Sequence, residues 1–531
     1  MELGAEAWQR QLRRLRARIA RSAFLALDME FTGLHSACPR GDERSLFDSP
    51  AKRYAKARQS VQRFAVAQLG LAIFSNDASN KYVVHSYNFF LFPSTLGLPD
   101  VEFALSASSV EFLSRHGFDY NKFLKDGIPY MNQAQEKVLR QHLFEGSLKV
   151  SSGLDRNVLK KAIDEVTCWI AAAEEDESMI LHDLSGWQML QVQLVLREAL
   201  QNVWTQPVGD KKVMVLKVSL QRRWLLENSR YDWCKKEFIL TSARGFTNLF
   251  LTLVKVKKPL VGHNMLTDLM HLHEKFYKPL PESYEEFKRN IHNLFPVLID
   301  TKTVTKSIWK KYQLPRVSNL LETYEVLCSS NLNSKDPSCP VIALARDCSR
   351  YAKKKSPHEA GYDAFLCGSV LLKAAHLLLC RSTDVALEAG PSFSQYLAAL
   401  AKYLNKVNFI RGAVRSVNFS GEDTSCHRPP ALVVRVCGWP GMNEMHVYKE
   451  FKALCRFDVR RLSRDQFILL TSKFKHMRLV LQDYKHHPHL QVSVYHHWRH
   501  SPSVSCLLQV SGVVALWSLL AFVLGGATRC S

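Results

Sequence analysis

The chain has 531 residues, of which 47% are hydrophobic, and its 71 Lys and Arg against 49 Asp and Glu give a formal net charge of +22. This composition excludes a largely disordered chain, and the length predicts two to four domains. The 13 cysteines include no Cys-x-x-Cys pair, which argues against a disulfide framework or a zinc site. The positive charge is typical of a surface that binds nucleic acid, with general solubility plus a membrane-facing patch as the alternative.

Residues 5–22 place six arginines among leucines and alanines. This pattern predicts a basic amphipathic helix that packs beside the first strand. A mitochondrial transit peptide is the alternative, but its cleavage would fall almost at Asp28.

The segment 23–31 predicts a strand in which an apolar run leads into Asp28 and Glu30. Because side chains alternate along a strand, the spacing of two residues places both acids on one face. Unpaired, each buried charge would cost on the order of several kcal/mol, and a hard divalent cation such as Mg²⁺ or Mn²⁺ removes that cost. The alternative is an edge strand whose acids face water.

Two further strands are predicted at 64–74 and 81–92, and helical patterns follow near 108–115 and 134–145. We assign these elements to the first part of a domain, residues 1–150.

An inserted αβ segment, residues 151–245, interrupts this domain. It has helical patterns near 155–173 and 187–202 and a strand at 213–218. The first domain resumes over 246–385.

Further acids follow in this second part. Residues 259–271 predict a short buried strand, a glycine turn and a helix start, so Asn264 and Asp268 lie about one helical turn apart. Singly, Asn264 could cap the helix and Asp268 could be a surface acid. We interpret Asp300 as a strand-end or cap acid, and Lys302 as either a phosphate contact or a solvated lysine.

A third segment begins at Pro357, a good start signal for the long apolar helix that follows. Asp363 falls on the first turns of this helix, and His358 lies five residues earlier. Alone, His358 could be an exposed loop histidine.

The C-terminal part begins with a smaller αβ pattern over 395–480. Its predicted strands are 407–410, 431–436 and 466–470, and its predicted helix is 446–455.

A His-rich and basic linker, 481–503, precedes an uncharged segment, 504–528. About 24 helical residues span roughly 36 Å, enough for a hydrocarbon core of about 30 Å. The segment therefore predicts a single-pass tail anchor that leaves the main body in the cytosol, at the endoplasmic reticulum or the mitochondrial outer membrane. A buried terminal helix is the alternative.

The order of these motifs carries a family resemblance. The chain contains Asp28-x-Glu30, His263-Asn264-x-x-x-Asp268 and His358-x-x-x-x-Asp363 in this order. This set of motifs resembles the His-bearing branch of the DEDD superfamily of 3′-to-5′ exonucleases. More closely, the chain resembles the poly(A)-specific ribonuclease (PARN) family and its tail-anchored, piRNA-trimming branch, through residues 30–34, 262–266, 295–302 and 358–363.

The resemblance implies an α/β, ribonuclease-H-like fold, a mixed sheet flanked by helices. It also implies that Asp28, Glu30, Asp268 and Asp363 hold two divalent ions, Mg²⁺ or in its place Mn²⁺, and that His358 is the general base. The expected products are 5′-mononucleotides and an RNA shortened from its 3′ end.

Four substrate contacts follow by resemblance: Phe31, Leu34, Asn264 and Lys302. Core packing is the alternative for the first two. The insert would be related to a nucleic-acid-binding module named for an Arg-x-x-x-His signature, which this insert lacks. Residues 395–480 would be a degenerate RNA-recognition-motif (RRM)-like domain, and a homodimer and a membrane-bound adaptor protein are the expected partners.

The sequence therefore predicts a 3′-to-5′ exoribonuclease that shortens poly(A) or trims piRNA precursors. A catalytically inactive RNA-binding adaptor on a nuclease scaffold is the alternative, and a DNA 3′ exonuclease is a third hypothesis.

Overall fold

A computed structural model describes residues 1–34, 45–76, 80–94, 101–144, 153–184, 186–209, 212–229, 236–315, 317–329, 338–380, 390–410, 414–423, 428–439 and 441–527. The chain divides into two compact units. The first comprises Met1–Ser36 and Ala57–Val407, and the second comprises Ala37–Lys56 and Asn408–Ser531.

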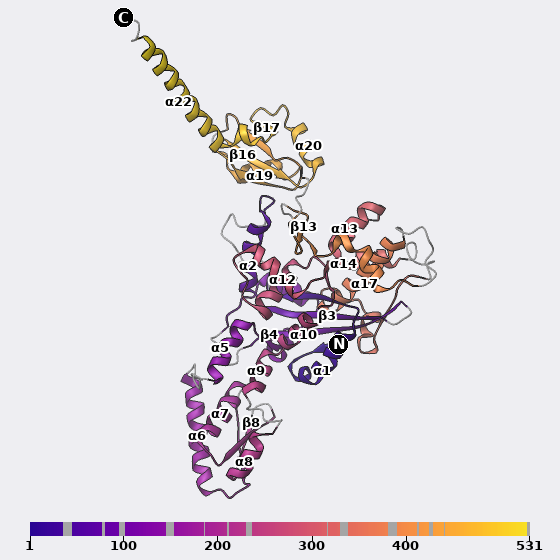
Figure 1. Cartoon of the computed structure of the whole chain (residues 1–531), viewed down its shortest axis with the longest axis vertical. Coiled ribbons are helices and arrows are strands. Elements are labelled where there is room, and N and C mark those ends of the chain that lie inside the picture. The colour runs from indigo at the N-terminus through magenta and orange to yellow at the C-terminus, as the bar shows by residue number, and fades with distance from the viewer. Residues whose placement is uncertain are drawn as a thin grey trace. The chain divides into compact units, whose positions relative to one another are not determined.

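An eight-stranded mixed sheet forms the centre of the first unit (Figure 1). Its main path runs β1-β4-β3-β2-β9-β10, and β5 and β11 also pair with β4. The strands β2, β3 and β4 are antiparallel neighbours, whereas β9 and β10 continue the sheet in parallel from β2. The strands are β1 (Glu2–Leu3), β2 (Phe24–Phe31), β3 (Val66–Asn76), β4 (Lys81–Pro93), β5 (Ile128–Tyr130), β9 (Leu260–Gly262), β10 (Leu298–Asp300) and β11 (Val341–Leu344).

Helices cover both faces of this sheet. One face packs under α17 (Ala360–Cys380), where Phe24 and Phe74 stack with ring centroids 4.5 Å apart. On the other face, Trp8 of α1 (Ala5–Arg21) packs against Phe89 and Phe246. The predicted α/β mixed sheet flanked by helices is therefore confirmed.

The helix α17 is apolar around its whole circumference because it lies in the core. Among the described residues it is the one helix long and apolar enough to cross a membrane, yet 78% of its most apolar window is buried inside the protein. We interpret it as a core helix.

The first unit has further helices around the sheet. They are α2 (Pro50–Arg63, shared with the second unit), α3 (Ala107–Arg115), α4 (Tyr120–Asp126), α5 (Gln133–Phe144), α9 (Lys236–Arg244), α10 (Thr247–Val256), α11 (Leu266–His271), η1 (Leu272–Tyr277), α12 (Tyr284–Leu294), α13 (Thr301–Tyr312), α14 (Leu320–Cys328), η2 (Arg346–Cys348), α16 (Arg350–Lys353), α18 (Phe393–Ala399) and η3 (Ala401–Tyr403).

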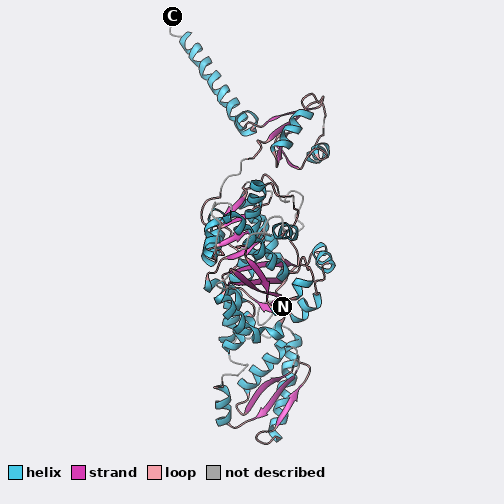
Figure 2. Cartoon of the chain, turned by 90° about the vertical axis from the view of Figure 1, so that its right-hand side faces the viewer, coloured by secondary structure: helices cyan, strands magenta, loops and turns pink. Residues whose placement is uncertain are grey.

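The inserted segment has a sheet and a core of its own (Figure 2). Its elements are α6 (Gly153–Ala172), β6 (Ser178–Leu181), α7 (Gly186–Ala199), β7 (Val203–Val208), β8 (Lys212–Lys217) and α8 (Leu220–Glu227). The strands pair in the order β6-β8-β7. The two predicted helices and the strand near 213–218 are present, whereas β6 and β7 were not predicted. The helix α9 packs with α5, which lies outside the insert, and not in the core of the insert.

The second unit contains an antiparallel sheet in the order β15-β16-β14-β17 (Figure 2). In the chain the elements follow as β14 (Leu432–Val436), α19 (Glu444–Phe451), β15 (Phe457–Arg461), β16 (Gln466–Thr471), α20 (Phe474–Asp483) and β17 (Leu490–Val494). This β-α-β-β-α-β order is that of the ferredoxin-like arrangement.

Two predictions for this region were wrong in detail. The strand expected at 407–410 is β12 (Lys406–Asn408), which pairs with β13 (Ser416–Asn418) and is not part of the four-stranded sheet. The sheet also extends past residue 480, since β17 lies in the segment predicted to be a linker. The short α21 (His497–His500) and the 26-residue α22 (Pro502–Ala527) follow.

Candidate active site

The first two acids of the site lie on β2. Asp28 pairs with Gly70 and Glu30 with Gln68 of the neighbouring β3. Because the sheet alternates its side chains, the acids share the face on which Phe24 packs under α17. The strand thus changes from apolar to acidic where the core ends and the helix α17 begins.

The third acid, Asp268, lies on α11, one turn after a tight loop that follows β9. Asn264 in that loop has a left-handed backbone, with φ of 61°. The Asp300 carboxylate accepts the backbone N–H groups of Asn264 at 2.9 Å and Met265 at 3.2 Å, and it caps α13 by accepting the N–H of Lys302 at 2.8 Å. Asp300 is therefore the cap acid that the sequence predicted, and it also fixes the loop leading to Asp268.

The fourth acid and the histidine come from the start of α17. Asp363 lies in the first turn of the helix, and its Oδ2 accepts the backbone N–H of His358 at 2.9 Å. His358 is exposed and has a left-handed backbone, with φ of 65°. Its ring lies against Phe112 and His116 of the α3 region, with centroids 4.7 and 4.4 Å away.

These segments, far apart in the sequence, meet at one place. A carboxylate oxygen of Glu30, a ring nitrogen of His358 and a carboxylate oxygen of Asp363 lie within 4.8 Å of one another. Burial raises the pKa of Asp28 well above its usual value, and the nearby charges of Asp363, Asp268 and Glu30 raise it further. Asp28 and Asp268 therefore belong to the same cluster. All four acids and the histidine predicted from the sequence are therefore brought together.

The negative charges of the four clustered acids are not balanced by the basic side chains that the structure describes. Burial, followed by the charges of Asp363 and Asp268, raises the pKa of Glu30, and burial raises the pKa values of Asp268 and Asp363 to about 7. Among the described Lys and Arg side chains, none forms an ion pair with any of the four acids. Oxygen-only donors with uncompensated negative charge fit hard divalent cations.

The four predicted substrate contacts have different environments. Phe31 is 7% exposed and stacks on His271 with centroids 4.0 Å apart, which is the packing that the alternative described. Leu34 is 49% exposed, and Asn264 lies in the loop held by Asp300. Lys302 is half-buried and close enough to His263 to lower the pKa of that imidazole, which burial lowers first, to about 3. Contact of these side chains with RNA stays a prediction.

Sequence reasoning missed the residues that seat α17 on the sheet. A Cβ at Gly70 would collide with the backbone of Ala360 and Gly361. The side chain of Gln68 accepts the N–H of Ala360 at 3.0 Å, and Asn88 accepts that of Gly361 at 2.5 Å. The local sequence around these β3 and β4 residues carries no signal for such long-range contacts.

Comparisons with known proteins identify the family of this chain. The model of the CAF1 family ribonuclease matches residues 4–371. The chain is 56% identical to a mouse protein named poly(A)-specific ribonuclease PNLDC1 over 529 residues, 99% of both chains. It is 28% identical to the silkworm pre-piRNA 3′-exonuclease trimmer over 98% of this chain and 96% of that one, and 30% identical to human poly(A)-specific ribonuclease PARN over 71% and 62%.

Among solved structures, the Mg²⁺- and Mn²⁺-bound form of S. pombe Pop2p matches 70% of this chain and 90% of that chain, with 14% identity and a TM-score of 0.35. The family model spans well over half of the chain and includes β2, α11 and the start of α17. The chain belongs to the CAF1 family of ribonucleases, and its likeness to the PARN branch, predicted from the sequence motifs, is confirmed.

Proposed function

We propose that this 3′-to-5′ exoribonuclease holds two divalent ions with Asp28, Glu30, Asp268 and Asp363 and uses His358 as its general base. The observation that carries the proposal is the gathering of four uncompensated carboxyl groups and one imidazole from three distant segments. Retention of all five groups favours an enzyme over an inactive adaptor.

When bound, two divalent ions stabilise the attacking and the leaving oxygen of an in-line displacement. The His358 side chain supplies the proton acceptor. Burial and then the neighbouring His116 lower the pKa of His358 below its usual value, so its imidazole is neutral near pH 7 and can take a proton from the attacking water. The hydrogen bond from the His358 backbone N–H to Asp363 fixes the base relative to a metal-binding acid.

The proposed substrate is a single-stranded RNA 3′ end, either a poly(A) tail or a piRNA precursor. The names of the relatives that match this chain over almost its whole length support this class. Leu34, Asn264 and Lys302 would contact the terminal nucleotides, whereas the packing of Phe31 on His271 fits the alternative of a core residue. The formal net charge of +22 adds attraction for the phosphate backbone.

Two accessory regions complete the proposal. We infer that the insert, 151–245, is a relative of the Arg-x-x-x-His module and that the RRM-like domain, 395–480 with β17, serves dimerisation or adaptor binding. Its four strands carry two aromatic side chains, Phe457 and Phe467, and both are buried in the core, so the sheet offers no aromatic platform for base stacking.

The helix α22 is the proposed tail anchor of a protein with a cytosolic nuclease, in the endoplasmic reticulum or mitochondrial outer membrane. Its described apolar side chains are largely exposed, for example Trp517 at 69% and Phe522 at 82%. A helix with such a surface is stabilised by a lipid environment.

The test uses the purified full-length chain in detergent with 5′-labelled RNA or DNA of the same sequence, in Mg²⁺ or EDTA. We expect RNA to shorten from its 3′ end only with Mg²⁺, and Asp28→Asn to abolish this. The matched control is Asp465→Asn, which alters an exposed aspartate of the second unit. RNA that stays full length while still bound would support the adaptor, and equal loss of DNA would support the DNA exonuclease.

A further inference from the structure

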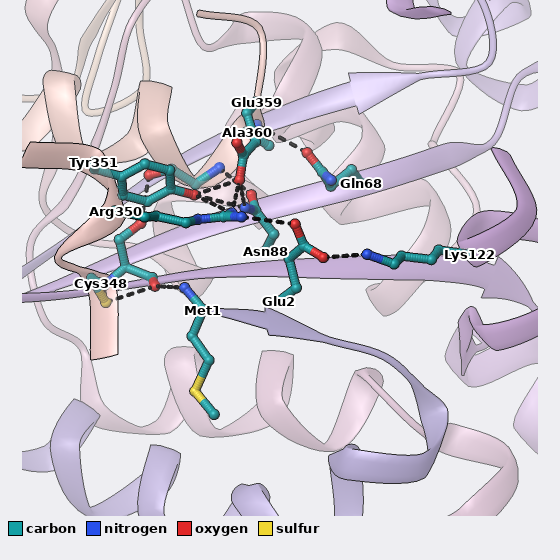
Figure 3. Close-up of polar contacts among 12 residues, drawn as sticks. Met1, Glu2, Gln68, Asn88, Lys122, Cys348, Arg350, Tyr351, Glu359 and Ala360 are labelled. Carbon is teal, nitrogen blue, oxygen red and sulfur yellow. Dashed lines mark hydrogen bonds and ion pairs between the residues drawn. The ribbon is translucent and has the colours of Figure 1, made fainter. Parts of the chain in front are cut away.

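Glu359 and Ala360, which directly follow His358 in the chain, are held from several sides (Figure 3). A left-handed backbone is unfavourable for a residue with a Cβ, so the conformation of His358 must be fixed by its surroundings. The two residues at the start of α17 are held from the sheet, because Gln68 and Asn88 accept the N–H groups of Ala360 and Gly361. Between this anchored start and His358 lies a single residue, Glu359.

The Glu359 carboxylate has an unusual concentration of donors. Its Oε1 accepts the Tyr351 hydroxyl at 2.6 Å and is also hydrogen-bonded by Asn88 Nδ2 and by the Arg350 guanidinium. The side chain is 22% exposed, so these charge-assisted bonds are partly shielded from water. Three donors from β4 and α16 therefore fix one oxygen atom next to the catalytic turn.

The backbone of Glu359 connects the same point to the metal site. Its carbonyl oxygen accepts the N–H of Asp363 at 3.0 Å and that of Tyr362 at 2.8 Å. Glu359 thus precedes the first turn of α17, follows His358 directly, and is bonded to the helix turn that carries a metal-binding acid.

The network continues outward to the first strand. Arg350 Nη1 donates to Glu2 Oε1 at 2.9 Å, and Lys122 Nζ donates to Glu2 Oε2 at 2.5 Å (Figure 3). Arg350 is therefore held by two carboxylates, one from β1 and one beside His358. Its guanidinium cannot turn away from Glu359 without breaking its ion pair with Glu2.

We infer that Glu359 is a positioning residue, which together with Asn88, Tyr351 and Arg350 holds the imidazole of His358 in its place beside the metal-binding acids. This inference rests on the proposed role of His358 as general base. Glu359 itself does not touch the reacting atoms. It acts by keeping the turn between His358 and Asp363 in one conformation.

The test is a double-mutant cycle on the full-length chain, with kcat and KM measured on 5′-labelled RNA in saturating Mg²⁺. Glu359→Ala should lower kcat about 10- to 100-fold, since a displacement of about 1 Å can cost that much, while KM changes less than about threefold. Glu359→Gln keeps an acceptor oxygen at the same place and should recover kcat to within about fivefold. Glu325→Ala, which removes an exposed acid paired with Lys355, is the matched control and should be near wild type.

The decisive comparison is made in a His358→Ala background. Loss of a general base should leave a slow but measurable reaction, about 10²- to 10⁴-fold down. If Glu359 acts through His358, adding Glu359→Ala to this background should slow the reaction by less than about threefold, because coupled residues give non-additive effects. The same 10- to 100-fold loss in both backgrounds would overturn the inference, since the effect would then come from the metal acids or from general instability.

A second variant covers the case in which Glu359→Ala does not fold. Tyr351→Phe removes only the hydroxyl that donates to Glu359, and it should lower kcat by about three- to tenfold in the wild type and not in the His358→Ala background. No loss from Tyr351→Phe in the wild type would overturn the inference. Full activity of His358→Ala would instead reject the proposed role of His358, which is distinguishable from the failure of Glu359 alone.

Discussion

The glycine opposite Asp28 is the position where one added methyl group should do most harm. In a strand, Gly→Ala ordinarily stabilises by about 0.5–1 kcal/mol. At Gly70, however, the new Cβ would overlap the backbone of Ala360 and Gly361, which cannot rotate away as a side chain would. Overpacking of this kind costs about 1–3 kcal/mol, so the net effect should be a loss of stability.

Gly70→Ala should lower the rate of RNA cleavage more clearly than it lowers the free energy of unfolding. To relieve the overlap, the start of α17 must move off the sheet, and Asp363 two residues beyond Gly361 moves with it. A displacement of about 1 Å at a catalytic group lowers the rate by about 100-fold. We therefore expect Gly70→Ala to remain folded but to lower the single-turnover rate on 5′-labelled RNA by about that factor.

The matched control is Gly512→Ala, because a Cβ at Gly512 meets no atom within 4 Å. It should leave the rate unchanged. A Gly70→Ala protein whose rate and melting temperature equal those of the wild type would refute the contact between β3 and α17 on which the reasoning depends.

Three other predictions concern the acids. Asp28→Asn should reduce RNA cleavage by more than the 10- to 100-fold typical of an outer-shell partner, measured with the labelled-RNA assay, and retention of activity in Mg²⁺ would contradict its role as a ligand. Burial and neighbouring acids raise the pKa values of Asp268 and Asp363 to about 7 in the folded metal-free protein. In the unfolded chain these carboxyl groups release their protons near pH 4, so between about pH 4 and pH 7 the folded state binds more protons than the unfolded state. The free energy of unfolding should therefore fall as the pH rises from about 4 to about 7. Mg²⁺ should therefore raise the melting temperature more at pH 8 than at pH 6 in scanning fluorimetry, and an equal rise at both would disprove this linkage. Asp300→Ala should lower the free energy of unfolding by about 1–3 kcal/mol in urea denaturation, because the backbone N–H groups of the loop before Asp268 lose their acceptor.

Much of the site could be predicted because short local sequence patterns determine where its acidic side chains lie. The alternation on β2 placed Asp28 and Glu30 on one face, and the helix start at Pro357 placed Asp363 on the first turn of α17. Family motifs then supplied the partnership between segments, which no local pattern contains. The structure agrees with each of these placements.

The remaining features depend on contacts between distant parts of the chain. Gln68 and Asn88 are polar residues within apolar strands, and nothing nearby shows that they reach the backbone of α17. Likewise β15 ends in two arginines, so its sequence alone does not indicate a strand, and its pairing depends on its neighbours in the sheet. By contrast, β17 alternates between apolar and polar residues over Leu490–Val494, and this pattern could have predicted the strand.

The active site is assembled from residues that the ribosome delivers at very different times. Asp28 emerges early, but its partner Asp363 belongs to a helix that begins at Ala360 and occupies the centre of the core. A nascent chain, or a truncated product that stops before this helix, therefore carries three of the four acids proposed to bind metal and lacks the fourth, Asp363. The cluster of four acids is therefore complete only after α17 has been made.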